Sequence, residues 1–134
     1  MSKLFNLLQP SQNFRISVSE IAKFLNIPEQ LIVRIECWQY VLFVHRCDVG
    51  GQFISYRKLQ QWLLATARQI QKCSTLLELL NFLVEIREDC QKHEKQYSAK
   101  HHQFLSHIWF QHWESLCSEQ NSLTPDSWLL APGS

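Results

Sequence analysis

Glycine and proline are missing from most of this 134-residue chain, and this constrains its fold more than any other feature. The glycine after Gly51 is Gly133, and no proline occurs between Pro28 and Pro125. These two residue types most often end helices and form turns. Apolar residues also recur at helical spacing through the same region. The sequence therefore predicts a mainly helical protein.

The N-terminal region predicts two short helices joined by a tight turn. Ser17-Val-Ser-Glu20 fits a capping box, in which the serine hydroxyl and the glutamate carboxylate each bond a free backbone N–H. The helix that follows should end near Asn26, and Pro28 suits the first position of a second helix. Its inward stripe would be Leu31, Ile32, Ile35 and Trp38, and its outward face Gln30, Val33, Arg34 and Cys37. This spacing is typical of a helix-turn-helix.

Residues 40–54 carry the one strong β signal. Residues 40–46 are rich in β-formers, residues 48–51 form a glycine-containing turn, and residues 52–54 can return as a second strand. We therefore expect a β-hairpin. Ser55 is expected to cap a third helix, Thr75 to begin a fourth with a second capping box, and a final helix to start near Phe104.

Charge is unevenly distributed, although the formal net charge is only +1. Residues 1–72 hold nine Lys/Arg against four Asp/Glu, a net charge of +5, and residues 73–134 hold four against eight, a net charge of −4. A basic half joined to an acidic half favours a polyanionic partner for the basic half.

Several functional classes are disfavoured. No apolar run is long enough to cross a bilayer, and the first residues lack the pattern of a signal peptide. Five widely spaced cysteines without a Cys-x-x-Cys pair indicate reduced thiols and a cytoplasmic location. The histidines do not repeat zinc-ligand spacing, and no catalytic or phosphate-loop motif is visible. We expect no metal, cofactor, small-molecule ligand or enzyme activity.

The sequence resembles the winged helix-turn-helix of MerR-type regulators and their excisionase-like relatives. The resemblance covers residues 16–63 and is carried by S-V-S-E-I-A-K-F-L (17–25), the Ile27-Pro28 turn, Arg34 and G-G-Q-F-I-S-Y-R-K-L-Q-Q-W-L (50–63). Val33-Arg34-Ile35-Glu36 departs from the Arg-Tyr-Tyr-Glu-like run usual in MerR-type proteins and is closer to the excisionase form. The resemblance implies a DNA-reading domain followed by a dimerising helical segment. Small regulators of this form occur with mobile elements, including CRISPR-associated transposases.

The predicted recognition helix and hairpin supply side chains suited to DNA. Glutamine can make two hydrogen bonds to adenine and arginine two to guanine, so Gln30 and Arg34 are candidates for base contacts. Arg46 and Gln52 would lie on the wing, and the remaining residues would contact phosphates. The predicted DNA-binding residues are Arg15, Ser17, Lys23, Gln30, Val33, Arg34, Arg46, Gln52, Tyr56, Arg57 and Lys58.

The helices after residue 73 predict a homodimer. Residues 76–86 would be apolar around most of the helix, which is more than one small winged domain can readily cover, although a monomer interior remains open. A two-fold dimer would present two recognition helices to a pseudo-palindromic double-stranded operator. The predicted interface is Leu76, Leu79, Leu80, Leu83, Ile86, Leu105, Ile108, Trp109 and Trp113.

These observations predict a mainly α fold in three parts. Residues 1–72 would form a winged helix-turn-helix with a short hairpin wing, residues 73–119 the dimerisation helices, and residues 120–134 a loose tail. The predicted function is that of a sequence-specific DNA-binding transcriptional regulator, a homodimeric MerR-type repressor. Two alternatives remain: an excisionase-like factor that bends DNA, and an adaptor that grips a partner protein with its C-terminal helices.

Overall fold

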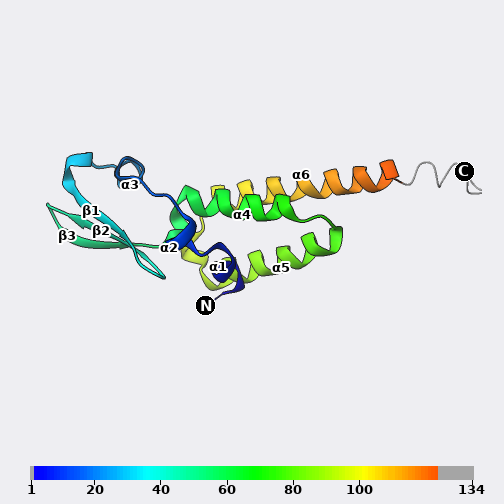
Figure 1. The fold of residues 1–134 in the computed structure, drawn as a ribbon, viewed down its shortest axis with the longest axis horizontal. Helices are drawn as coiled ribbons and strands as arrows, with labels where there is room; N and C mark the ends of the chain where they lie inside the picture. Colours follow the sequence, from blue (N-terminus) through cyan, green and yellow to red (C-terminus); the bar gives the residue numbers. More distant parts are fainter. Residues whose placement is uncertain (1, 124–134) are drawn as a thin grey trace, which may run out of the picture.

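The computed structural model describes residues 2–123, which place a small sheet at one end of an elongated molecule and long helices at the other (Figure 1). The helices and strands are α1 (Lys3–Leu8), α2 (Pro10–Asn13), α3 (Val18–Leu25), β1 (Ile32–Cys37), β2 (Leu42–Arg46), β3 (Gly50–Ile54), α4 (Gln60–Lys72), α5 (Leu76–Lys92) and α6 (Ala99–Leu123). Short 3-10 turns occur at η1 (Glu29–Leu31), η2 (Tyr56–Lys58) and η3 (Glu94–Gln96). The prediction of a mainly helical chain is confirmed.

Helix α3 begins where the sequence predicts. The Ser17 hydroxyl accepts a hydrogen bond from the Glu20 N–H at 3.1 Å, and the Glu20 carboxylate accepts one from the Ser17 N–H at 3.2 Å. Both halves of the predicted capping box are therefore formed. The helix ends because Asn26 adopts a left-handed conformation, with φ of 57°, and its N–H turns back to helix carbonyls.

The predicted second helix is wrong: after η1 the chain enters β1. β-branched residues at 32, 33 and 35 favour an extended chain. The pairing of β1 with β2 is irregular between Ile32 and Arg34, which adds one residue to the strand. Ile32 and Ile35 consequently both face the core although they are three residues apart. A helix produces the same spacing, so the apolar pattern at 31–38 was misassigned.

The sheet is antiparallel, in the order β1-β2-β3. The predicted hairpin is confirmed as β2 and β3, with Leu42 opposite Ile54 and Arg46 opposite Gly50. Gly50 has a φ of 84° at the turn, a conformation that glycine adopts without strain. β1 pairs with the other edge of β2, and its residues 32–37 are those that the helix-turn-helix prediction put in the recognition helix.

Of the later helices, α5 begins at its predicted cap, whereas α4 and α6 begin at other residues than predicted. Ser55 caps the η2 turn, and α4 follows it. The Thr75 hydroxyl accepts a hydrogen bond from the Glu78 N–H at 3.1 Å. The Glu78 carboxylate, however, accepts hydrogen bonds from Ser74 and not from the Thr75 N–H, so only half of the predicted capping box is formed. Helix α6 begins at Ala99 and continues through residues 120–123, which were assigned to the predicted tail. Residues 124–134 of that tail lie outside the described residues.

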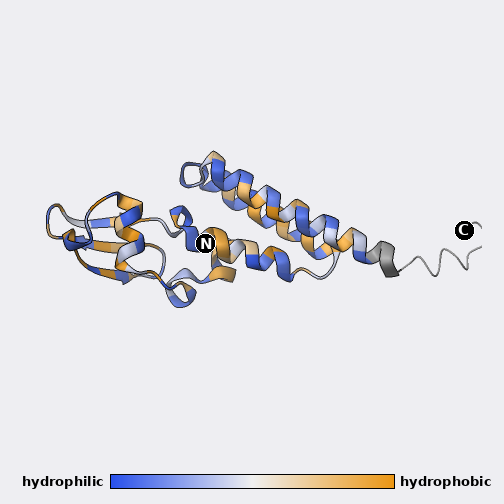
Figure 2. Ribbon diagram, turned by 90° about the horizontal axis from the view of Figure 1, so that it is seen from above, coloured by the Kyte–Doolittle hydropathy of each residue, from blue (hydrophilic) through white to orange (hydrophobic). Residues whose placement is uncertain are grey.

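One hydrophobic core joins the sheet to the helices. It includes Leu42 and Val44 from β2, Trp62 from α4, Leu79 from α5 and Leu105 from α6, and it draws residues from both 1–72 and 73–119. Hydrophobic and hydrophilic residues alternate around the long helices, as expected for helices that each bury one side (Figure 2). Each large apolar side chain that is fully buried contributes about 1.5–3 kcal/mol.

Candidate functional site

Aromatic side chains gather on the outer face of the sheet, the face that points away from the core. The Trp38 and Phe43 rings stack with their centroids 5.1 Å apart and their planes 14° apart. The Phe53 ring lies edge-on to Trp38 at 5.3 Å and 5.5 Å from Phe43. We call Trp38, Phe43 and Phe53 the aromatic platform.

Strand alternation puts these rings together. Leu42 and Val44 of β2 are fully buried, so the intervening Phe43 points to the opposite face. Phe43 is paired with Phe53 on β3, which places their side chains next to each other on that face. Trp38 follows β1 and is held by its backbone, because its carbonyl accepts a hydrogen bond from the Tyr56 hydroxyl at 2.6 Å.

The platform is open to solvent. Phe53 is 58% exposed and Trp38 is 44% exposed, although both are large apolar residues. The three rings do not belong to the hydrophobic core, which lies on the other face of the sheet. They mark this face as a candidate binding surface.

Gly51 allows the platform to lie flat against the sheet. A Cβ atom at this position would lie 2.7 Å from Cε1 of Phe43, which is closer than carbon atoms can approach. The Phe43 ring therefore covers the backbone of β3 at Gly51. A side chain at position 51 would therefore displace the outer end of the Phe43 ring.

A polar border adjoins the rings. The Arg34 guanidinium donates from Nε to Glu36 at 2.7 Å and from Nη1 to Nδ1 of His45 at 2.9 Å. The Trp38 indole N–H donates to the other Glu36 oxygen at 3.1 Å. The hydrogen bonds from Arg34 and Trp38 lower the pKa of Glu36, so this carboxylate is charged at neutral pH and orients both partners.

Of the predicted DNA-binding residues, the structure brings only Arg34 to the border of the platform. Gln30 is exposed in η1 and Val33 is exposed at the irregularity in β1. Arg46 and Gln52 do lie together, with a hydrogen bond of 3.0 Å. They occupy the other face of the sheet, where Arg46 is ion-paired with Asp48 at 2.7 Å.

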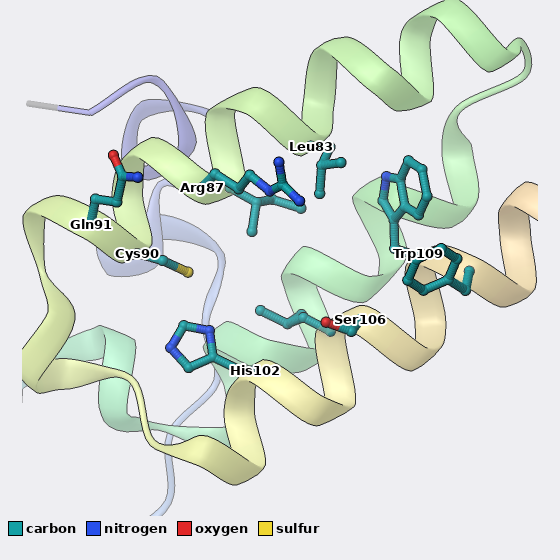
Figure 3. A pocket seen from close by; sticks show the side chains of 10 residues that line it. Leu83, Arg87, Cys90, Gln91, His102, Ser106 and Trp109 are labelled. Atoms are coloured by element: carbon teal, nitrogen blue, oxygen red, sulfur yellow. The ribbon is translucent and has the colours of Figure 1, made fainter.

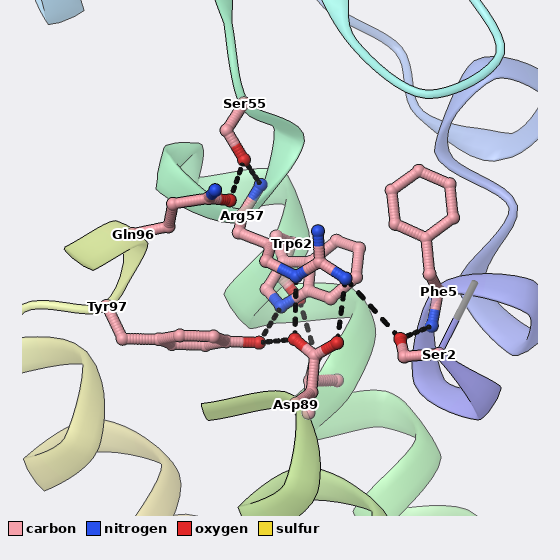
Figure 4. A network of polar contacts seen from close by, with 9 residues as sticks. Ser2, Phe5, Ser55, Arg57, Trp62, Asp89, Gln96 and Tyr97 are labelled. Atoms are coloured by element: carbon pink, nitrogen blue, oxygen red, sulfur yellow. Dashed lines mark hydrogen bonds and ion pairs between the residues drawn. The ribbon is translucent and has the colours of Figure 1, made fainter. Parts of the chain in front are cut away.

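Two predicted phosphate contacts are wrong because their side chains are buried. The Arg57 guanidinium makes two hydrogen bonds of 2.7 Å to Asp89 on α5 (Figure 4) and contacts the rings of both Phe5 and Trp62, with centroid distances of 5.1 and 5.0 Å. Tyr56 has no exposed surface, and its hydroxyl is bonded to the Trp38 carbonyl. Neither residue can reach a phosphate without disrupting the core.

The Asp89 carboxylate is the centre of this buried network. Burial raises the pKa of Asp89, but hydrogen bonds from Arg57, Ser2 and Tyr97 together lower it by a larger amount. The pKa of this carboxyl therefore lies below its ordinary value. Tyr97 in turn accepts a hydrogen bond from the Trp62 indole at 2.9 Å. The network ties the N-terminus, α4 and α5 together, so its role is structural.

The remaining predicted DNA contacts are dispersed. Arg15 is exposed, and Ser17 is occupied as the cap of α3. Lys23 and Lys58 are both exposed and line a cleft of about 470 Å³ between α3 and the start of α4, together with Phe24. The two lysines are thus close to each other but are not part of the aromatic platform.

The predicted dimer-interface residues lie largely within the core of a single chain. Leu79, Ile86, Leu105 and Trp109 are buried, and the Trp109 indole donates to the Leu79 carbonyl at 3.1 Å. Packing of α5 against α6 therefore accounts for much of the apolarity that predicted a dimer. Leu80 is exposed, and the half-buried members of the set are Leu76, Leu83, Ile108 and Trp113.

Sequence reasoning missed the aromatic platform. It assigned Trp38 to the inward stripe of a helix and used Phe43 and Phe53 only as β-formers. One signal was present in the sequence: residues 41–44 are all apolar, so a strand over them has apolar side chains on both of its faces. The exposure of one face could not be read from that pattern, because it depends on which elements pack against the sheet.

Within residues 2–123, His, Cys, Asp and Glu do not form a group of three or more that could hold a metal ion. None of the helices in this range combines the length and apolarity needed to cross a membrane. A scan against protein-family models gave no match, and searches of curated proteins and of solved structures found no similar chain. The function is therefore inferred from the residues of this chain.

Proposed function

We propose that this chain binds nucleic acid by stacking unpaired bases on the aromatic platform. The observation that carries the proposal is the contiguous set of three rings on the outer face of the sheet, of which Trp38 and Phe53 are exposed and Phe43 is half-buried. Stacking of a base on an aromatic side chain contributes about 1–3 kcal/mol and depends little on base identity, because every base has a π-face.

The platform favours single strands over duplexes. Bases inside a duplex are covered on both faces by their neighbours, whereas bases of single strands, loops and ends can lie flat on protein rings. The segment expected to read a major groove, residues 29–38, contains η1 and β1 instead of a helix. We therefore do not propose that this segment binds in a DNA groove.

The charges around the platform support a strand that passes along its Arg34 side. Arg34 uses Nε and Nη1 within the protein and has no protein partner at Nη2 among the described residues, which leaves a donor for a phosphate. Exposed basic residues elsewhere in residues 1–72, such as Lys23 and Lys58, add a general attraction for a polyanion.

A regulatory role rests on this binding. The sequence predicts a transcriptional repressor, and a protein that holds a melted or single-stranded segment near a promoter can act in that way. Double-stranded operator binding and excisionase-like bending are the competing modes, and both require affinity for a duplex.

A second candidate is that the same platform docks a protein partner. The observation that favours it is the ion pair between Arg34 and Glu36, which leaves an apolar patch with a nearly neutral border. Aromatic residues are enriched at the centres of protein interfaces.

Fluorescence anisotropy with labelled oligonucleotides tests the proposal. Wild-type protein is titrated into single-stranded DNA, single-stranded RNA and duplex DNA over a range of salt concentrations. We expect the single strands to bind more tightly than the duplex. Phe53→Ala should weaken single-strand binding about 5- to 150-fold, which corresponds to the loss of one stacked base.

Val49→Ala is the matched control, since Val49 is an exposed apolar residue in the same hairpin but outside the platform. It should leave the affinity unchanged. Equal loss in both variants would contradict stacking on the platform. Failure of folded wild-type protein to bind any single strand at low salt would overturn nucleic-acid binding and turn attention to a protein partner.

A further inference from the structure

A groove lies between α5 and α6, outside the sheet that carries the aromatic platform (Figure 3). Both helices line it, over residues 83–91 of α5 and 102–110 of α6. Its volume is about 380 Å³. Pockets that bind small molecules have volumes of about 300–1,000 Å³, so the groove is large enough for a compact ligand.

The groove is apolar at one end and polar at the other. Leu83, Trp109 and Phe110 line the apolar end, whereas Gln91 and His102 line the polar end (Figure 3). The two ends are distinct because α6 turns back along α5, so that residues late in α5 lie beside residues early in α6. Eight residues separate Leu83 from Gln91, which corresponds to about 12 Å along a helix. The lining therefore suits a molecule with one apolar and one polar end.

Arg87 supplies the charge of the groove. Among the described residues that line the groove, it alone carries a permanent charge, and none is Asp or Glu. Its guanidinium forms no ion pair with any residue that the structure describes. This lone cation lies in the half of the chain that holds four Lys/Arg against eight Asp/Glu. The Gln91 amide and the Ser106 hydroxyl also line the groove and are further hydrogen-bond donors. The polar part of the groove thus favours an anion.

Cys90 lines the groove, but its thiol is not a nucleophile. Burial raises the pKa of Cys90 to about 11, so the thiol stays protonated at neutral pH. The thiolate is the reactive form of cysteine, whereas a protonated thiol behaves as a small apolar group. The groove is therefore suited to reversible binding and not to covalent attachment of a ligand.

We propose that the groove binds a small molecule with an apolar body and one carboxylate, such as a medium-chain fatty acid. The apolar body would lie against Leu83, Trp109 and Phe110, and the carboxylate would pair with Arg87. A guanidinium can make two parallel hydrogen bonds to a carboxylate, and the two charges balance. The amino-acid pattern gave no sign of this site, since its lining comes from two helices and forms no short motif. The proposal is independent of nucleic-acid binding.

Isothermal titration calorimetry with decanoate tests the proposal, and decanol is the uncharged probe of the same chain length. Wild-type protein should bind decanoate at one site per chain. Arg87→Gln should weaken decanoate binding about tenfold, because charged hydrogen bonds are lost, and should leave the affinity for decanol unchanged. Arg68→Gln removes an exposed arginine of α4 outside the groove and should change neither affinity.

Phe110→Ala tests where the apolar body lies. It removes an apolar wall, so it should weaken the binding of both probes by the same factor. Leu77→Ala is the matched control, since it removes an exposed apolar side chain of α5 outside the groove and should leave both affinities unchanged. Far-ultraviolet circular dichroism checks that each variant is folded.

Three results would each overturn the proposal. The first is the absence of saturable decanoate binding by folded wild-type protein. The second is a loss of affinity in Arg87→Gln that is equal for decanoate and decanol, or equal to the loss in Arg68→Gln. The third is an equal effect of Phe110→Ala and Leu77→Ala, which would place the bound chain outside the groove.

Discussion

Two arginine–carboxylate pairs show how differently the two ends of this molecule use the same chemistry. Arg34 and Glu36 on the sheet, and Arg57 and Asp89 in the core, both have their closest N···O contact at 2.7 Å. The Arg34 side chain is 55% exposed and that of Arg57 only 5%. The first pair can exchange a partner for a ligand, whereas the second holds separate elements together.

The comparison also corrects the use of charge as a functional signal. The excess of Lys and Arg in residues 1–72 predicted a polyanion partner. Arg57 belongs to that excess, yet its charge is balanced by Asp89 in the acidic half of the chain. Part of the asymmetry is therefore an ion pair within the fold, and only exposed basic residues such as Arg34, Lys23 and Lys58 can act on a ligand.

Removing the buried arginine should have the largest effect. Arg57→Ala leaves Asp89 without its main partner in a site with no exposed surface. We expect the free energy of unfolding to fall by about 3–5 kcal/mol, as measured by urea denaturation. A loss no larger than that of an exposed arginine variant would show that water or another side chain replaces the pair.

Overpacking the sheet face should have an intermediate effect. Gly51→Val puts side-chain atoms where the Phe43 ring now lies, so that ring must leave the platform or β3 must shift. We expect a loss of about 1–3 kcal/mol in the free energy of unfolding. Single-strand affinity should fall by more than the smaller fraction of folded protein explains. Anisotropy and urea denaturation on the same preparation measure both. Unchanged affinity would show that the position of the Phe43 ring does not matter for binding.

Acid should weaken the core through Asp89. Its pKa in the folded state is lowered from an ordinary value of 3.8, so its stabilising contribution is complete above that value and is lost as the pH falls below it toward the folded-state pKa. The urea midpoint of the wild type should therefore decrease below about pH 3.8 more steeply than that of Asp89→Asn. Parallel pH profiles for the two proteins would show that Asp89 is not responsible.

Removing the exposed arginine should have the smallest effect on stability. Arg34→Ala breaks a solvent-screened pair, so the urea midpoint should stay close to that of the wild type. Single-strand affinity should fall and its dependence on salt should become shallower, because one phosphate contact is lost. Arg68→Ala, an exposed arginine on α4, is the control that should change neither property. A large loss of stability in Arg34→Ala would remove the contrast between the two pairs.

Local signals were read correctly from the sequence. The capping box at Ser17, the hairpin around Gly50 and the start of α5 after Thr75 each depend on residues only a few positions apart. The candidate site was predicted poorly, since of the expected DNA-binding residues only Arg34 borders the aromatic platform. Its three rings come from a strand end and two paired strands, and no short-range pattern reports that they share an exposed face.

The amino-acid sequence by itself determined that the chain is mainly helical, where its hairpin turns, and which residues begin α3 and α5. Tertiary structure alone decided that residues 32–37 form a strand, because partners on β2 outweigh a spacing that also suits a helix. It also decided that Arg57 is internal, since its partner Asp89 lies 32 residues away along the chain. The reason is common to both: strand pairing and ion pairing join distant residues, and their free energy appears only when the chain has folded.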